Sequence, residues 1–420
     1  MIFNIIINTI VLLLAWVLYK KHSKLFFFFL PFIIQYVWMS FSVSTIESGF
    51  YITEQKRHGY FVGANFYLLI FFLLSIISFS QAFYFIINKT SNNLPQLKFY
   101  GLSNVKTLST IVLTLLLLGL LNMFLSNNIY FDSNRGQWPE AITKFNFWQK
   151  SQFPVLKAVL GNTIGFLPFI LGITFNYFRK KTIIYFILYL AYLIGIGQKF
   201  GPILNATVAF MMSFFVVQAN RDLIKNRIKP RWIILAGALL FALVFVKYSL
   251  DNPYDHLGYS VIESIVQRAF GLQAHVFWGV VDKYVVTKEL MYSWDIKELN
   301  FGMHKLMEVF WQSPTHWLED TIARGVSWTN GYPAILFTIV PWYLAYIIHT
   351  ILFVLVGIIA GLVYKFIYEK KFFWATLFFQ AYIWIIHIYT MSYFYKVYPV
   401  LFILITASLV SSLKKPDLNN

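Results

Sequence analysis

Two basic residues stand in surroundings that favour binding of an anion, and the first is Arg268. Arg268 and His275 are seven residues apart in VIESIVQRAFGLQAHVFWGVV, where apolar residues recur at helical spacing, so both side chains fall on one helix face. A guanidinium carries five donors in a planar fork that matches the oxygens of phosphate. This pair therefore predicts an anion site. The structural alternative is an arginine that reaches from the membrane interface to water.

The second basic residue, Lys199, lies in GQKFGPI between two long apolar runs. Gly197 and Gly201 flank it, and glycine lets a ligand approach the backbone closely. A lone cation at the outer mouth of two membrane spans suits a lipid-linked phosphate. The alternative is a hairpin lysine that contacts lipid headgroups.

The stretch HWLEDTIARGVSWTNGYPA combines basic, acidic and amide side chains, namely His316, Glu319, Asp320, Arg324 and Asn330. His316, Asp320 and Arg324 are spaced four apart, so they can share one helix face. A carboxylate there could act as general base toward a sugar hydroxyl. A salt-bridged surface helix is the alternative. Asn330 and Gly331 predict a turn that leads into an apolar run.

Two further polar connections could contact a carbohydrate. Arg135 and Trp138 lie in DSNRGQWPE, where aromatic and charged side chains together offer a common way to hold a sugar. Glu47, in IESGFYITEQ, has similar surroundings. An ordinary polar loop is the alternative for each of these segments.

The residue pattern argues against a metal mechanism. The chain has no cysteine, and His275, His304 and His316 do not show the spacing of metal ligands. We therefore expect neither a metal nor a cofactor. His349 and His387 lie inside apolar segments, and we interpret them as packing residues.

Composition places these residues in a membrane protein. Of the 420 residues, 59% are hydrophobic and 12% are charged, against about 25% charged in a soluble domain. Apolar windows of about 20 residues, the length that crosses the hydrocarbon layer, recur along the chain. We expect an all-α, polytopic integral membrane protein that forms a single membrane domain over 1–420. Its eleven expected spans lie near 2–19, 25–43, 61–88, 106–126, 158–178, 182–197, 202–219, 232–250, 343–366, 372–392 and 395–413.

The distribution of Lys and Arg sets the expected orientation. The odd-numbered connections and the C-terminal tail together hold 19 basic and three acidic residues, whereas the other side holds 15 basic and 14 acidic residues. We therefore expect a cytoplasmic C-terminus and an N-terminus on the outer side. The net charge of +17 then mainly sets topology, so nucleic acid is not expected as a partner.

Two of the outer connections are long and rich in candidate residues. They cover 127–157 and 251–342, and the second is too apolar for a flexible linker and too charged to span the membrane. We expect it to form several amphipathic helices on the outer, membrane-facing surface. Together the two loops are expected to form the active-site cavity.

In these features the chain resembles the Wzy-type polymerases of bacterial O-antigen and capsule, which share a superfamily with the O-antigen ligases. The residues that carry the resemblance are GQKFGPI, VQRAFGLQAH and GVSWTNGYPAILFTIVPWYLAYIIHTILFVLVGIIAG. The number of spans and the long outer loop are also similar. Lys199 is a departure, because relatives often have an arginine at that place.

The resemblance implies a metal-independent glycosyltransferase in the bacterial inner membrane, with the N-terminus periplasmic. It would join oligosaccharide repeat units, carried on undecaprenyl pyrophosphate, at the outer face. Lys199 and Arg268 would hold the pyrophosphate, with Arg135 or Arg324 assisting. The acceptor hydroxyl would be activated by one of Glu319, Asp320, His316 or His275. The implied partners are the lipid-linked glycan donor and acceptor, the lipid bilayer and a chain-length regulator protein.

Three other functions compete with this interpretation. An O-antigen ligase uses the same donor, so the sequence barely separates it from a polymerase. A lipid-linked oligosaccharide flippase or other transporter would show matching halves and charges at mid-membrane, whereas the ionisable residues here cluster in outer loops. A membrane acyltransferase would need a histidine and an acid beside a cytoplasmic span end, and no such pair occurs.

Overall fold

The computed structural model describes most of the apolar segments and part of the long loop at 251–342. The described residues are 2–49, 62–88, 105–125, 166–195, 200–219, 245, 249, 258–271, 273–310, 319 and 330–412. Within these ranges the secondary structure is helical, without strands. The chain divides into two compact units. Unit 1 comprises Met1–Phe79, Leu223–Phe353 and Ile386–Lys396, and unit 2 comprises Ser80–Asp222, Val354–Ile385 and Val397–Asn420.

Six helices among the described residues are long and apolar enough to cross a membrane. They are α1 (Ile2–Lys21), α2 (Ser23–Glu47), α3 (Ala64–Asn88), α4 (Val105–Leu125), α16 (Trp342–Tyr368) and α17 (Phe372–Met391). A helix satisfies its own backbone hydrogen bonds, which the hydrocarbon layer requires of any segment that crosses it. Large apolar side chains such as Ile351 on α16 and Leu13 on α1 are exposed, as on a lipid-facing surface. The protein is therefore a multi-pass membrane protein in its architecture.

Four other helices fall in four more of the expected spans. They are α7 (Leu167–Phe175), α8 (Arg179–Gly195), α9 (Phe200–Ala219) and α18 (Val397–Ser412). The expected span at 232–250 lies almost entirely outside the described residues. The six long helices support a membrane protein, and the total of eleven spans stays a prediction.

The described part of the loop at 251–342 folds into short helices. They are α11 (Val261–Val266), π-helical η4 (Gln267–Gly271), α12 (His275–Val280), π-helical η5 (Val281–Val286), 3₁₀-helical η6 (Ile296–Asn300), α13 (Met303–Phe310) and α15 (Ala334–Ile339). Helix α13 is amphipathic, as expected, because Met303, Leu306, Met307 and Phe310 form its buried face. Every residue of α12 and α15 is buried, which differs from the expected amphipathic surface helices.

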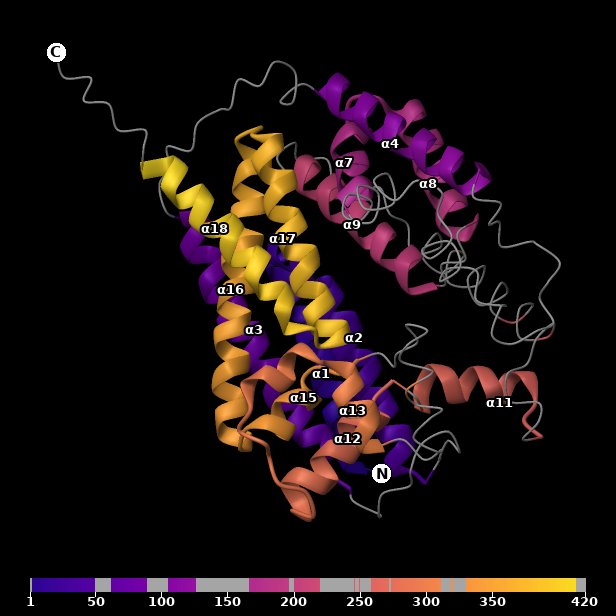
Figure 1. Ribbon diagram of the computed structural model, residues 1–420, viewed down its shortest axis with the longest axis vertical. Helices are drawn as coiled ribbons and strands as arrows, with labels where there is room; N and C mark the ends of the chain where they lie inside the picture. Colours follow the sequence, from indigo (N-terminus) through magenta and orange to yellow (C-terminus); the bar gives the residue numbers. More distant parts are fainter. Residues whose placement is uncertain are drawn as a thin grey trace. The chain divides into compact units, whose positions relative to one another are not determined.

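The loop helices and the membrane helices of unit 1 share one core. Helices α12, α13 and α15 contact one another, and α12 also contacts α2 (Figure 1). Phe71 on α3 lies 5.4 Å from Phe337 on α15 between ring centroids, and Tyr67 lies 6.4 Å from the same ring. An apolar helix that is buried on all sides is typical of a core element. The long loop is thus part of the folded unit rather than a layer on its surface.

In unit 2, α7 and α9 approach closely at a glycine. A methyl group placed on Gly172 would collide with the carbonyl oxygen of Phe210 and the hydroxyl of Ser213. Small residues allow such close approach of membrane helices, where van der Waals packing rather than the hydrophobic effect drives association. On another face of α7, Phe169 stacks on Phe379 of α17, with ring centroids 3.8 Å apart.

This packing predicts that Gly172→Ala destabilises unit 2. The added methyl has to push α9 away from α7, and overpacking of this kind costs about 1–3 kcal/mol. Thermal unfolding in detergent, followed by size-exclusion chromatography, should show a lower midpoint for Gly172→Ala. Ile187→Ala on the exposed face of α8 is the control and should leave the midpoint nearly unchanged. Equal midpoints for Gly172→Ala and the wild type would contradict the close α7–α9 packing.

Candidate functional site

Four fully buried polar side chains meet in the core of unit 1. His349 on α16 places its Nδ1 atom 2.6 Å from the hydroxyl of Tyr332 and its Nε2 atom 2.7 Å from the hydroxyl of Ser75 on α3. The Ser75 hydroxyl is 3.0 Å from that of Tyr36 on α2. All four residues have no more than traces of exposed surface. Buried polar groups are costly unless paired, and this cluster pairs them.

The hydrogen bonds determine which nitrogen of His349 carries the proton. Its Nε2 atom is 2.9 Å from the backbone carbonyl of Phe71, and a carbonyl can only accept a hydrogen bond. Nε2 is therefore the donor, and in a neutral imidazole Nδ1 then accepts from the Tyr332 hydroxyl. The ring thus connects α3 to the segment that precedes α15. This agrees with the interpretation of His349 as a packing residue whose hydrogen bonds are satisfied.

The predicted turn at Asn330 and Gly331 is anchored on two sides. The backbone N–H groups of both residues donate to the carbonyl of Thr390 on α17, at 2.8 and 3.3 Å. The Asn330 side chain donates to the side-chain oxygen of Gln273 at 2.8 Å. Asn330 has φ +62°, a left-handed conformation that asparagine tolerates better than most residues. A Cβ on Gly331 would lie 2.7 Å from the Ser392 hydroxyl and 2.9 Å from the terminal methyl of Met303, so a larger residue would have to displace these side chains.

Arg268 lies in the π-helical segment η4, directly after the short helix α11. The segment is held to the membrane helix α2 by one buried side chain. The hydroxyl of Ser42 donates to the carbonyl of Gly271 at 3.1 Å and accepts from the N–H of Ala274 at 3.0 Å. Single-turn π-helices occur often at functional sites. The backbone that carries Arg268 is therefore fixed near the C-terminal end of α2.

Glu47, predicted to contact substrate, is the last residue of α2 and makes contacts within the protein through both carboxylate oxygens. Oε1 accepts from the backbone N–H groups of Gly63 and Ala64 at 2.9 and 2.8 Å, at the start of α3. Oε2 accepts from the Asn4 side chain on α1 at 2.7 Å. A carboxylate at a helix N-terminus satisfies unpaired N–H groups and favours the helix dipole. In this structure Glu47 joins the ends of α1, α2 and α3.

The other predicted site residues are distributed as follows. His275 is buried at the start of α12, with its ring stacked on Trp278 at 6.1 Å, and Glu319 is exposed. Lys199, Arg135, Trp138, His316, Asp320 and Arg324 lie outside the described residues. Among the residues that the structure describes, no group of three histidine or acidic side chains could hold a metal ion.

Sequence reasoning did not assign a role to the pairing of Tyr332 with His349, although one signal was present. His349 is an ionisable residue within a span, and such residues are rare enough to indicate a specific partner. The partner lies 17 positions earlier, in the turn segment that was itself a candidate. Periodicity and spacing cannot show this contact, because it depends on how the turn folds back onto α16.

His304 is a titratable residue of this unit that lies outside the membrane spans. His304 on α13 has its Nε2 atom 3.2 Å from the Tyr393 hydroxyl, and the two rings meet edge to face. Burial lowers the pKa of His304 from its usual 6.5, and the charge of Glu308 opposes this effect. The folded protein therefore favours the neutral imidazole.

The pairing of Tyr332 with His349 predicts that Tyr332→Phe lowers stability. The substitution leaves Nδ1 of His349 buried without a donor, which costs about 1–3 kcal/mol. The midpoint of thermal unfolding in detergent should fall measurably. Tyr343→Phe is the matched control, since Tyr343 is an exposed tyrosine on the same unit. If both variants unfold like the wild type, the hydrogen bond does not support the fold.

The lowered pKa of His304 predicts a pH-dependent loss of stability. An unfolded chain binds a proton near pH 6.5, whereas the folded chain binds it only at lower pH, so stability decreases as pH falls through this window. The unfolding midpoint should therefore fall between pH 7 and pH 5. His304→Gln keeps a polar side chain without this titration and should show a shallower fall. If the unfolding midpoint of His304→Gln falls with pH as steeply as that of the wild type, other groups cause the pH dependence.

Comparison with known proteins adds one partial match. Residues 297–406 match the model of a family described as a family of unknown function (DUF6418). The match begins in η6 and includes the Asn330–Gly331 turn, α15, α16 and α17. No curated protein and no solved structure matches the chain. This part of the chain, which contains Tyr332, His349 and the anchored turn, is thus similar to a family whose function is unknown.

Proposed function

We propose that this protein is a membrane-embedded glycosyltransferase that polymerises lipid-linked oligosaccharide repeat units. The growing glycan leaves its undecaprenyl pyrophosphate carrier and joins the non-reducing end of a newly delivered repeat unit. The reaction takes place at the outer face of a bacterial inner membrane and contributes to O-antigen or capsular polysaccharide. Arg268 and Lys199 bind the pyrophosphate, with Arg135 or Arg324 assisting, and no metal takes part.

The observation that supports this proposal most strongly is the attachment of η4, which carries Arg268, to α2. Ser42 holds η4 at a point five residues before the end of α2 at Glu47. The bias of Lys and Arg toward the other side predicts that this end of α2 lies at the outer face. We expect a residue on this backbone segment to lie where a lipid-linked pyrophosphate enters from the bilayer.

The chemistry needs a fixed positive charge at that level. When the carbon–oxygen bond to the pyrophosphate breaks, negative charge develops on the leaving oxygens. Donors that are already in place stabilise this charge without reorganising, and an arginine does so with two parallel hydrogen bonds. The acceptor hydroxyl has to lose its proton as the new glycosidic bond forms. An exposed carboxylate such as Glu319 suits this role better than His275, which is buried.

The anchored turn at Asn330 and Gly331 supports the same region as the site. Its side-chain contact to Gln273 lies five residues after Arg268, and its backbone contacts reach α17. The turn therefore joins the segment that follows η4 to the C-terminal end of α17. A site of this kind sits on rigid elements, which transition-state stabilisation requires.

The test is complementation of a gene deletion in the host with single variants. Arg268→Ala should reduce the rate of polymer formation by about 10²–10³-fold, because it removes one preorganised donor. Arg268→Lys should retain part of the activity, since it keeps the charge and loses the fork. The measurement is the ladder of surface polysaccharide on a gel, with membrane abundance determined for each variant. Arg179→Ala, which removes an exposed arginine from the expected cytoplasmic side, is the matched control and should restore the full ladder.

Each outcome distinguishes the competing functions. If the deletion leaves single repeat units on the surface and the wild type restores the ladder, the protein is a polymerase. Loss of all surface glycan in the deletion, single units included, would instead indicate an O-antigen ligase or a flippase. A full ladder with Arg268→Ala at normal abundance would remove Arg268 from the site.

A further inference from the structure

One segment of the outer loop exposes an unusual number of large apolar side chains. It covers residues 286–301, between η5 and the start of α13, and its exposed members are Val286, Met291, Tyr292, Trp294, Ile296 and Phe301. Met291 is 89% exposed and Ile296 is 70% exposed. Exposed apolar side chains that gather on one segment often mark a surface that another apolar phase covers.

Two backbone hydrogen bonds hold this segment next to the start of a membrane helix. The N–H of Ser293 donates to the carbonyl of Thr338, and the N–H of Trp294 donates to the carbonyl of Ile339, both at 3.0 Å. Ile339 is the last residue of α15, and α16 begins three residues later at Trp342. Trp294 is therefore held close to the end of a membrane span.

That span begins with exposed aromatic residues. Trp342 and Tyr343 are both about half exposed, and their rings meet edge to face. Trp294 is 56% exposed and makes a similar contact with Tyr292, with ring centroids 5.1 Å apart. Tryptophan and tyrosine gather at the membrane–water interface, because their rings are apolar and their edges bind water or headgroups. The two aromatic pairs thus lie at the level expected for one interfacial belt.

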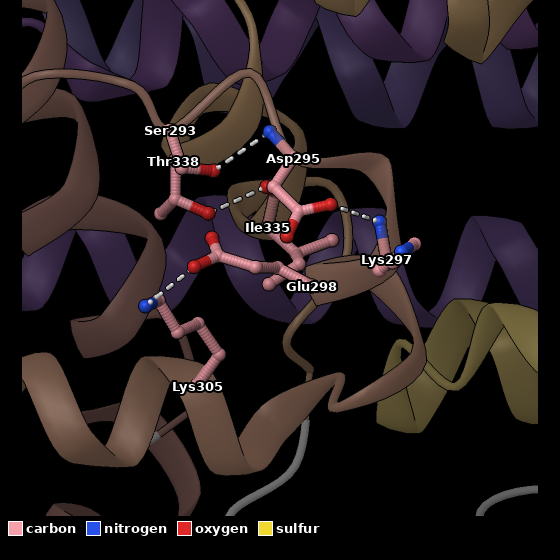
Figure 2. A network of polar contacts seen from close by, with 7 residues as sticks. All are labelled: Ser293, Asp295, Lys297, Glu298, Lys305, Ile335 and Thr338. Atoms are coloured by element: carbon pink, nitrogen blue, oxygen red, sulfur yellow. Dashed lines mark hydrogen bonds and ion pairs between the residues drawn. The ribbon is translucent and has the colours of Figure 1, made fainter.

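The acidic side chains of the segment form hydrogen bonds or ion pairs within the protein. Asp295 accepts from the N–H of Lys297 at 2.9 Å and caps η6, and Glu298 accepts from Lys305 at 2.9 Å (Figure 2). Glu289 pairs with Lys283. The exposed Lys288 and Lys297 remain as basic side chains beside the apolar ones. Lysine stems lie along apolar surface while their charged ends reach phosphate groups, so this combination fits lipid better than it fits water.

From these contacts we infer that residues 286–301 form an interfacial segment that inserts into the headgroup layer of the outer leaflet. Its partner is the lipid surface of the bilayer that α16 crosses. The segment does not span the membrane, and it holds the loop that carries η6 and α13 against the bilayer. This inference depends on the membrane architecture and not on the proposed glycosyl transfer.

The absence of cysteine from the chain allows a direct test with single labels. Met291→Cys and Ile296→Cys would each carry an environment-sensitive fluorophore, in vesicles of phosphatidylcholine and phosphatidylglycerol in equal amounts. Quenching would be compared for a nitroxide on the lipid headgroup, a nitroxide deep in the acyl chain, and iodide in water. Ile351→Cys on the exposed face of α16 calibrates the deep position, and Glu308→Cys on the exposed face of α13 calibrates water.

Labels at Met291 and Ile296 should be quenched several-fold more by the headgroup nitroxide than by either other quencher. Quenching by iodide as strong as at Glu308 would overturn the inference, because the segment would then face water. Weak quenching by all three agents would also overturn it, since a second copy or another protein would then cover the segment. The readout needs no enzymatic activity, so its failure is separate from failure of the proposed function.

A second set of variants tests the role of the lysines. Replacing Lys288 and Lys297 with serine should reduce headgroup quenching of the Ile296 label in the mixed vesicles. The same replacement should have little effect in pure phosphatidylcholine, which lacks the net negative charge. An equal loss in both kinds of vesicle would show that the change disturbs the segment itself and would contradict the electrostatic part of the inference.

Discussion

Unit 1 depends on one constraint, which is that polar groups near the hydrocarbon layer must find partners within the protein. The loop helices are too apolar to remain in water, yet their ends carry backbone groups that need hydrogen bonds. Ser42 supplies partners for the end of η4, Thr390 for the turn at Asn330, and Glu47 for the start of α3. Each of these contacts joins a loop or helix end to a membrane helix. They explain why a long, mostly apolar loop folds as part of the membrane core.

The same contacts show which parts of the fold can be predicted from the sequence and which cannot. Composition and window length predict the membrane helices well, because each span needs only a run of apolar residues. Helix ends are less predictable, since α2 continues through Glu47 where a polar loop was expected to have begun. The carboxylate of Glu47 gains its partners from α1 and α3, and no local pattern reveals them. For α12 and α15, burial on every side results from tertiary packing, which helical periodicity does not specify.

The candidate site is predictable only in part, for the same reason. The turn at Asn330 is a local feature, and the described structure has a left-handed asparagine there. The expected single helix face for Arg268 and His275 is wrong, because the π-helix that carries Arg268 ends at Gly271 and a turn at Gln273 and Ala274 precedes α12. Tyr332 and His349 are brought together by the fold, and their pairing gives the turn a fixed place on α16. The proposed transferase chemistry rests on this combination of a fixed cation segment and a fixed turn at one end of the spans. Attachment of residues 286–301 to the membrane interface would hold a third segment of the loop in place, beside η4 and the turn.

The attachment at Ser42 has a mechanical consequence. One hydroxyl both donates to Gly271 and accepts from Ala274, so the end of the π-helix is clamped to a single position along α2. Any tilt or vertical shift of α2, such as a change in bilayer thickness would produce, must carry η4 with it. The depth of Arg268 is therefore set by the membrane helix rather than by the loop. For the proposed site, the depth of α2 in the bilayer would therefore determine how far the backbone at Arg268 lies from the lipid phosphates.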